Sequence, residues 1–282
     1  MALNDMPGTL YVVATPIGNL EDFSRRGADV LGGVAMIAAE DTRRTRVLLD
    51  AVHVSGVPVV ALHSHNESVS SASVLERLRQ GDDVALVSDA GTPLLSDPGF
   101  ELVRACWAEG LAVVPIPGAS AVAAAVSVCP LPCGRFLFEG FLPAKPVQRR
   151  QRLRELLQLA VAVVFFEAPH RIADTLADLA LLAPEQRVMV GREMTKRHEQ
   201  YLCDVPRAVA EALTGAGRTK GEFVCVLEGA GAAAAPAEVR RTMEILSREL
   251  APAQAARLGA QLLGRGKREL YDLAIAIDRD VE

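Results

Sequence analysis

The chain has 282 residues, of which 50% are hydrophobic, and a formal net charge of −5 at pH 7. This length exceeds what one hydrophobic core usually organises, so it predicts two domains with or without an appendage. The apolar runs fall short of a membrane span and the N-terminus lacks an export signal, which together favour a soluble cytoplasmic protein. The net charge excludes a uniformly basic surface for nucleic acid, but a local basic patch can still form.

Strands and helices alternate along the first half of the chain. Apolar runs predict strands at 9–14, 36–39, 57–62, 83–87 and 112–117, and helical periodicity follows most of them. This alternation is typical of an α/β fold with a parallel sheet covered on both faces. In such sheets, ligands bind to loops at the carboxyl ends of the strands.

Residues 88–99 (SDAGTPLLSDPG) form the most distinctive of these loops. Gly91 and Gly99 permit left-handed backbone or the close approach of a ligand, and the two prolines stiffen the segment. Residues 15–22 (TPIGNLED) give a similar loop after the first strand. The chain contains neither GxxxxGK[ST] nor GxGxxG, so these loops are not predicted to cradle phosphates. An ordinary Pro/Gly turn is the alternative for residues 88–99.

Polar side chains follow two further strands of the first half. Residues 40–46 (EDTRRTR) open a helix, and their arginines are either solvated helix charge or cations of a site. His63 and His65 stand close to Glu67, but no second cluster completes a ligand set, so we expect no metal site. The odd number of cysteines, with no Cys-x-x-Cys motif, predicts reduced and buried thiols: Cys106, Cys129, Cys133, Cys203 and Cys225.

The second half repeats the pattern of polar clusters at strand ends. Strands are predicted at 162–166, 187–192 and 222–227, and a basic helix at 145–154. We therefore predict an N-terminal α/β domain at 1–118, a C-terminal α/β domain at 119–229 with a linker near 129–134, and a cleft between the two. Residues 230–236 form a low-complexity linker, and 237–282 form a helical tail that is either a nucleic-acid binder or a packing element.

Several short motifs occur in a fixed order along the chain, at 15–22, 39–43, 65–67, 88–99, 115–118, 138–143, 169–171 and 220–223. In this order they resemble the tetrapyrrole methylase superfamily and, within it, the ribosomal RNA small subunit methyltransferase I family. The resemblance runs from about Leu10 to Leu227 and continues into the tail at 266–271. Each motif alone is weak, whereas the ordered set is specific.

The resemblance implies S-adenosylmethionine as methyl donor and the ribose 2′-hydroxyl of a cytidine in the decoding region of 16S rRNA, within the 30S subunit, as acceptor. It also implies a cytoplasmic homodimer. Small-molecule members of the superfamily carry a GxGPGDP-type first loop where this chain has Thr15-Pro16-Ile17-Gly18-Asn19, which favours the RNA branch. A tetrapyrrole methyltransferase of the same fold is the alternative, and a non-catalytic RNA-binding factor is a further one.

The resemblance and the strand-end loops together indicate the site residues. The donor is expected on main-chain groups and strand ends at Pro16, Asp89, Ala90, Gly91, Thr92, Pro117, Gly118, Ser120, Phe166, Glu222 and Phe223. Candidates for a general base or an orienting group are Glu40, Asp41, His65 and Glu167, each of which could instead be structural. Candidates for gripping RNA phosphates are Arg43, Arg171, Lys196 and Lys220.

Overall fold

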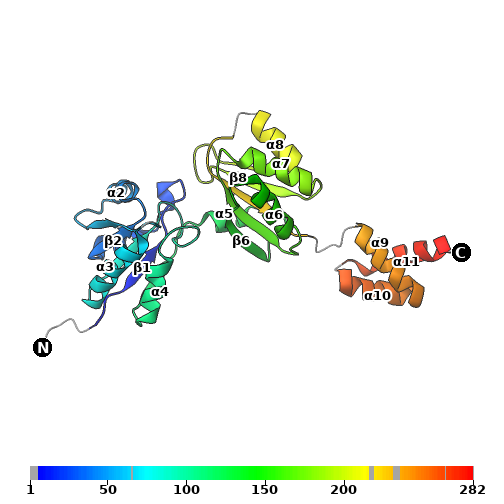
Figure 1. The fold of residues 1–282 in the computed structure, drawn as a ribbon, viewed down its shortest axis with the longest axis horizontal. Coiled ribbons are helices and arrows are strands. Elements are labelled where there is room, and N and C mark those ends of the chain that lie inside the picture. Colours follow the sequence, from blue (N-terminus) through cyan, green and yellow to red (C-terminus); the bar gives the residue numbers. More distant parts are fainter. Residues whose placement is uncertain (1–5, 65, 216–218, 231–235, 264, 282) are drawn as a thin grey trace. The chain divides into compact units, whose positions relative to one another are not determined.

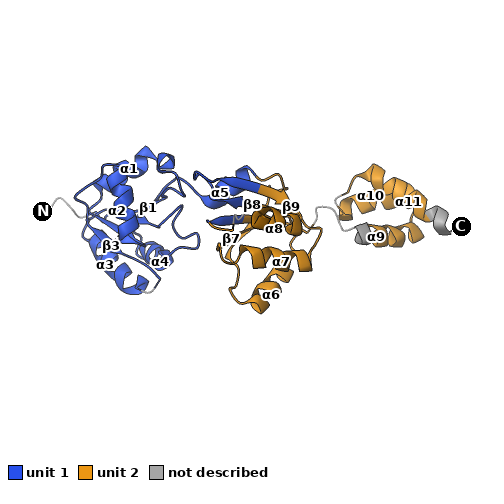
Figure 2. Ribbon diagram, turned by 90° about the horizontal axis from the view of Figure 1, so that it is seen from above, with its two compact units in different colours: residues 1–128, 191–201, 221–224 blue, residues 129–190, 202–220, 225–282 orange. Residues whose placement is uncertain are grey.

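The computed structural model describes residues 6–64, 66–215, 219–230, 236–263 and 265–281 (Figure 1). The chain divides into two compact units, coloured separately in Figure 2. Unit 1 comprises Met1–Val128, Gly191–Tyr201 and Gly221–Val224, and unit 2 comprises Cys129–Val190, Leu202–Lys220 and Cys225–Glu282. Residues 119–128 therefore group with the N-terminal half.

The first sheet lies within unit 1 and has the strand order β3-β2-β4-β1-β5. Every pairing in it is parallel, with Leu10 opposite both Val84 and Val113. The carboxyl ends of its strands therefore meet at one edge. The predicted strands are confirmed, with β2 at its predicted bounds and the other four slightly shorter than expected: β1 (Leu10–Val13), β2 (Met36–Ala39), β3 (Val59–Ala61), β4 (Val84–Val87) and β5 (Val113–Ile116).

Helices cover both faces of this sheet. Val84 and Leu86 of β4 pack in one core cluster with residues of α3 (Glu67–Arg79) and α4 (Phe100–Ala108). Ala85 and Val87 pack in the other, with Leu31 of α1 (Arg25–Gly33) and Leu49 of α2 (Thr42–Ala51). Successive side chains of a strand point to opposite faces, so burial on both sides explains why β4 reads as an unbroken apolar run. The short helices η1 (Leu20–Asp22) and α5 (Ala121–Ser127) complete the elements before residue 129.

The second sheet has the order β6-β7-β10-β8-β9. Its strands are β6 (Phe136–Phe141), β7 (Ala162–Glu167), β8 (Val188–Arg192), β9 (Gln200–Asp204) and β10 (Phe223–Leu227). The helices of this half are α6 (Pro146–Leu156), α7 (Ile172–Leu182) and α8 (Pro206–Gly215). The predicted basic helix corresponds to α6, but its Arg149 is only 3% exposed and pairs with Asp178 of α7 at 2.8 Å. Part of the basic run is therefore a buried structural pair.

The tail consists of α9 (Pro236–Glu249), α10 (Pro252–Leu263) and α11 (Lys267–Val281), as predicted. Met243, Leu270 and their neighbours form a core cluster made of tail residues alone. A Cβ at Gly259 of α10 would lie 2.6 Å from the Met243 sulfur, so the glycine allows α10 to pack closely against α9. The tail is thus a small helical module with its own core.

The cysteines differ in part from expectation. All five are free, and Cys106 and Cys225 are buried as predicted, but Cys129, Cys133 and Cys203 are partly exposed. The prediction that these three thiols are buried was wrong. Cys129 and Cys133 lie in the 129–134 segment, and Cys203 lies on the edge strand β9. Across the described residues, no helix has the length and apolar content needed to cross a membrane.

Candidate functional site

The loop at residues 88–99 joins β4 to α4 at the carboxyl edge of the first sheet. Its start is tied to the end of β1 by a two-way main-chain bridge, in which the Thr15 amide donates to Gly91 O at 2.8 Å and the Gly91 amide donates to Thr15 O at 3.0 Å. The buried Thr15 hydroxyl adds a bond to Ser88 O at 3.2 Å. Gly91 has φ +81°, and a Cβ there would lie 3.3 Å from the Ile17 side chain. The two Pro/Gly loops predicted at this edge therefore meet.

The middle of the loop has an unusual backbone. Leu94 and Ser96 have φ values of 73° and 74°, a left-handed conformation that side chains with a Cβ rarely adopt. The Ser96 amide donates to Leu94 O at 3.1 Å, which closes a tight local turn. Such conformations persist only where the surroundings enforce them, and they cluster at functional sites. The loop is therefore held in one specific shape.

A third loop joins this arrangement. The Thr92 hydroxyl donates to Ala119 O at 3.1 Å, in the connection between β5 and α5. In the same connection, a Cβ at Gly118 would lie 3.1 Å from the Ala14 side chain, and the Ser120 hydroxyl caps α5. The structure thus brings together most of the residues predicted for the donor in unit 1: Pro16, Asp89, Ala90, Gly91, Thr92, Pro117, Gly118 and Ser120.

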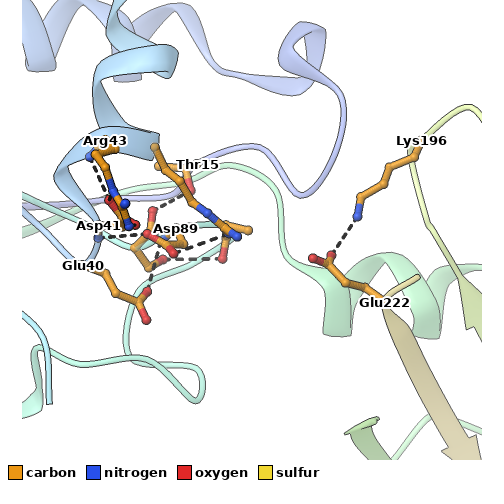
Figure 3. A network of polar contacts seen from close by, with 10 residues as sticks. Thr15, Glu40, Asp41, Arg43, Asp89, Lys196 and Glu222 are labelled. Atoms are coloured by element: carbon orange, nitrogen blue, oxygen red, sulfur yellow. Dashed lines mark hydrogen bonds and ion pairs between the residues drawn. The ribbon is translucent and has the colours of Figure 1, made fainter. Parts of the chain in front are cut away.

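Acidic side chains gather beside the start of the loop (Figure 3). Asp89 is at the centre, because its amide donates to the Glu40 carboxylate at 3.2 Å and its own carboxylate accepts from the Asp41 amide at 3.0 Å. Arg44 reaches the Asp89 carboxylate at 3.4 Å. Glu40 and Asp41 follow β2 while Asp89 follows β4, so the parallel pairing of these strands places the three carboxylates together.

Asp41 is the N-cap of α2. Its carboxylate accepts from the Arg43 amide at 2.8 Å and pairs with the Arg43 guanidinium at 2.8 Å. The hydrogen bond from the Arg43 side chain lowers the pKa of Asp41 to about 2. A carboxylate with so low a pKa is a poor proton acceptor near neutral pH, so this environment suits capping and pairing better than base catalysis.

Asp97 lies in the same loop and has the opposite character. The pKa of its carboxyl is raised to about 6, chiefly by burial and also by the nearby Glu40 and Asp89 charges, while a hydrogen bond with Ser88 opposes the rise. Perturbed carboxyls of this kind are frequent among catalytic acids and bases. The sequence does not reveal Asp97 as a candidate, because its carboxyl is desolvated by the folded loop and not by residues next to it in the sequence.

A cavity of about 160 Å³ opens next to these groups. It lies between the first loop, the start of α2 and the start of the 88–99 loop. Its lining is Thr15, Pro16, Gly18, Leu20, Arg44, Thr45, Val47, Leu48, Ser88 and Asp89. A lining that combines apolar side chains with polar groups is typical of sites for small organic ligands.

The candidates at the end of β7 are held inside unit 2. Glu167 is 2% exposed, accepts from the Thr175 hydroxyl at 2.6 Å and pairs with Arg171 at 3.0 Å. Arg171 also donates to Leu142 O at 2.7 Å. The Phe166 ring makes edge contacts with Phe138 and Phe141, at centroid distances of 5.0 and 5.5 Å. The bonds of Glu167 and Arg171 therefore tie the end of β7 to α7 and to the segment that follows β6.

The remaining predicted residues lie near the end of β8 and the start of β10. Lys196 pairs with Glu222 at 2.9 Å (Figure 3). It also pairs with Glu193 at 3.1 Å. Phe223 is buried at the start of β10, and Lys220 precedes Gly221 in the turn before that strand. Within unit 1, a Cβ on Gly18 would lie 2.4 Å from the Lys196 side chain, so Gly18 allows the lysine to cross the first loop closely.

His65 lies outside the described residues. Among those that are described, no group of at least three His, Cys, Asp or Glu side chains is arranged to hold a metal ion. The unit 1 site offers main-chain groups in a fixed shape, an apolar cavity and one carboxyl that titrates near neutrality. This combination can bind an organic cofactor and accept a proton.

Family comparisons cover nearly the whole chain. The family described as Tetrapyrrole (Corrin/Porphyrin) Methylases matches residues 9–208, and the RsmI C-terminal HTH domain matches residues 233–278. A protein of Xylella fastidiosa strain Temecula1, Ribosomal RNA small subunit methyltransferase I, is 48% identical over 94% of this chain and 98% of its own length. Proteins of the same name from Haemophilus influenzae and Pseudomonas aeruginosa are 41% and 43% identical, over 97% and 95% of this chain and 99% and 97% of theirs.

Solved structures share the fold at low sequence identity. Diphthine synthase matches with a TM-score of 0.59 and 17% identity, over 79% of this chain and 90% of its own. Uroporphyrin-III C-methyl transferase from Thermus thermophilus, complexed with S-adenyl homocysteine, matches with a TM-score of 0.54 and 16% identity, over 78% and 97%. These matches confirm the predicted two-domain α/β architecture of tetrapyrrole methylases.

The raised pKa of Asp97 predicts a pH-dependent stability. The folded protein retains a proton on Asp97 between about pH 4 and 6, where the unfolded chain releases it. The free energy of unfolding of the wild type should therefore fall relative to that of Asp97→Asn as the pH rises through this window. Urea titrations at a series of pH values measure the difference.

A matched control comes from Asp41, whose pKa shift has the opposite sign. Its contribution is present above about pH 4 and is lost towards pH 2, so Asp41→Asn should differ from the wild type in pH dependence only at the acidic end. Wild-type and Asp97→Asn stabilities that run parallel from pH 4 to 7 would contradict the assignment for Asp97.

Proposed function

Because the chain belongs to the tetrapyrrole methylases and, within them, to the ribosomal RNA small subunit methyltransferase I family, we propose that it methylates small-subunit ribosomal RNA with S-adenosylmethionine as donor. The acceptor we propose is the ribose 2′-hydroxyl of a cytidine in the decoding region of 16S rRNA. The observation that carries the proposal is similarity over 94% of the chain to a relative of that name, with the tail included.

The donor site we propose is the shaped loop at the carboxyl edge of the first sheet. Main-chain groups of residues 89–92 and 117–120 would hold the cofactor, and Phe166, Glu222 and Phe223 stay candidates on sequence grounds. Three features support this fit: the tied start of the loop, its left-handed residues and the adjoining cavity. When bound, S-adenosylmethionine supplies a methyl group attached to a positively charged sulfur.

Transfer to a hydroxyl requires alignment of the reacting atoms, exclusion of water and a group that accepts the proton of the hydroxyl. Of the carboxylates around the loop, we propose Asp97 as the first candidate for that acceptor. Its pKa of about 6 leaves it ionised yet basic at neutral pH. Glu40, which hydrogen-bonds to the Asp89 amide, is the second candidate, and His65 stays a candidate on sequence grounds. Asp41 and Glu167 are better explained as partners of arginines.

For the RNA backbone, we propose contacts from exposed cations near the site. Arg43 has a side chain that is 86% exposed, and its pair with Asp41 is of the exposed kind that contributes little stability. An RNA phosphate can therefore replace the Asp41 carboxylate as the partner of Arg43 with little loss of free energy. Lys196 and Lys220 remain further candidates, and Arg171 would have to leave buried partners in order to take part.

We propose that the protein is cytoplasmic, because the RNA that we propose as its substrate belongs to the ribosome.

We also propose a homodimer, in agreement with the resemblance. β6 is an edge strand, and it exposes Phe136, Leu137 and Phe141 at 44%, 37% and 54%. Exposed aromatic side chains on an unpaired edge are typical of interaction surfaces. A second copy of the chain would cover them.

The substrate is tested with tritiated S-adenosylmethionine and purified protein. We expect label to enter 16S rRNA of 30S subunits and to map to a ribose 2′-oxygen, with none on a porphyrin. Label on the porphyrin alone would support a tetrapyrrole methylase, and no transfer together with intact RNA binding would support a non-catalytic factor.

The donor loop is tested with Gly91→Val. This change forces a branched side chain onto a left-handed backbone with Ile17 only 3.3 Å from the new Cβ, so calorimetry should show donor affinity reduced at least ten-fold. Gly110→Val is the control, because Gly110 also has a positive φ, +69°, but open space around it. Unchanged donor affinity in Gly91→Val would show that the loop is misassigned.

The dimer surface is tested with Phe141→Glu. Light scattering should give a wild-type mass of twice 30.0 kDa and a variant shifted towards the monomer. Leu181→Glu, which is 74% exposed on α7, is the control and should remain dimeric. A monomeric wild type at micromolar concentration would contradict the homodimer.

A further inference from the structure

Asn66 and Glu67 have no part in the site described above, although they belong to a motif of the set that carries the family resemblance. The side chain of Asn66 closes the turn after β3. Its Oδ1 accepts from the main-chain amide of His63 at 2.7 Å, and its Nδ2 donates to Ala61 O at 3.0 Å. Asn66 is also the N-cap residue of α3. Its side chain makes no cap bond to the helix, but its two bonds at the end of β3 and just after it hold the start of α3, and with it Glu67, beside the end of that strand.

Glu67 reaches the end of the 88–99 loop. One of its carboxylate oxygens, Oε1, accepts from the Gly99 amide at 2.9 Å and from the Glu101 amide at 2.9 Å. Gly99 is the N-cap of α4 and has no side chain with which to cap the helix. A carboxylate from 32 residues away takes that place, where the free amides and the dipole of a helix start favour negative charge.

The position of Gly99 makes this cap part of the loop and not only of the helix. Gly99 has φ +118°, and a Cβ there would lie 2.7 Å from the Leu86 side chain of β4. It follows the left-handed Leu94 and Ser96 within a few residues. The loop is thus tied at its start by Thr15 and at its end by Glu67, with the unfavourable backbone between the two ties.

We propose that Glu67 is a positioning residue for the methyl donor, because its carboxylate fixes the carboxyl end of the 88–99 loop in its binding shape. The inference rests on the donor site proposed above. Without the tie, the unfavourable backbone relaxes and a smaller fraction of molecules carries a competent loop. Apparent donor affinity falls in proportion to that fraction, while the reaction in the saturated enzyme is largely preserved.

A purely structural function for Glu67 would have a different signature, and the chain offers a matched control. The opposite ends of the same two helices are joined by Arg79 of α3 and Glu109 at the C-cap of α4, with bonds of 2.8 and 2.6 Å. Glu109→Ala removes a carboxylate tie between α3 and α4, as Glu67→Ala does, but far along the helices from the loop.

The experiment compares wild type, Glu67→Ala, Glu67→Gln and Glu109→Ala in the full chain. Calorimetry gives the dissociation constant for S-adenosylmethionine, thermal unfolding gives Tm, and methylation of 30S subunits gives KM and kcat. We expect Glu67→Ala to weaken donor binding on the order of ten-fold, with KM for the donor raised and kcat changed less than two-fold. Glu67→Gln keeps an acceptor oxygen and should recover most of the affinity, and Glu109→Ala should bind as the wild type even where its Tm falls.

Three results would overturn the inference. The first is Glu67→Ala binding the donor as tightly as the wild type. The second is Glu109→Ala losing as much affinity as Glu67→Ala, which would reduce the effect to general helix stability. The third is donor affinity lost in Glu67→Gln as fully as in Glu67→Ala at unchanged Tm. Where Glu67→Ala does not fold, Glu67→Asp takes its place, because the shorter side chain keeps the charge but loses the reach to the Gly99 amide; a folded Glu67→Asp that binds the donor as tightly as the wild type would overturn the inference. A wild type that binds no donor is a separate result, and it refutes the proposed function itself.

Discussion

The main-chain bridge between Thr15 and Gly91 is the interaction on which the site depends. β1 and β4 are neighbours in a parallel sheet, so their carboxyl ends meet at one edge, and the bridge locks together the loops that follow them. Once the start of the 88–99 loop is fixed there, Asp89 falls beside Glu40 and Asp41, and Thr92 falls beside Ala119. The acidic cluster depends in addition on the parallel pairing of β2 with β4, which brings Glu40 and Asp41 to the same edge.

Electrostatics then distinguishes carboxylates that sequence alone leaves equivalent. Asp41 is held ionised by Arg43, whereas burial favours the neutral form of Asp97. The two residues belong to adjoining loops of one sheet edge, yet their pKa values differ by several units for reasons of partner and burial. The net charge of the chain says nothing about this, because many cations of the described chain have local acidic partners.

The sequence predicted the first sheet well because its strands read as apolar runs, and the inner strands β2 and β4 are buried along their whole length. It also located the 88–99 loop, whose glycines and prolines mark it, and the helix that opens within residues 40–46. It missed β9, since a short edge strand of sequence QYLCD mixes polar and apolar residues without a clear period. Asp97 and Glu67 were out of reach for another reason: the burial of one and the long-range capping by the other arise only when distant segments fold together.

The tail has a consequence for how the protein loses its structure. Its core cluster contains only residues of α9, α10 and α11, so these helices bury their apolar side chains against one another. A segment that has its own hydrophobic core, and that a low-complexity linker joins to the rest of the chain, unfolds as a separate cooperative unit. Calorimetric traces of the whole chain should accordingly contain more than one transition, each with its own melting temperature.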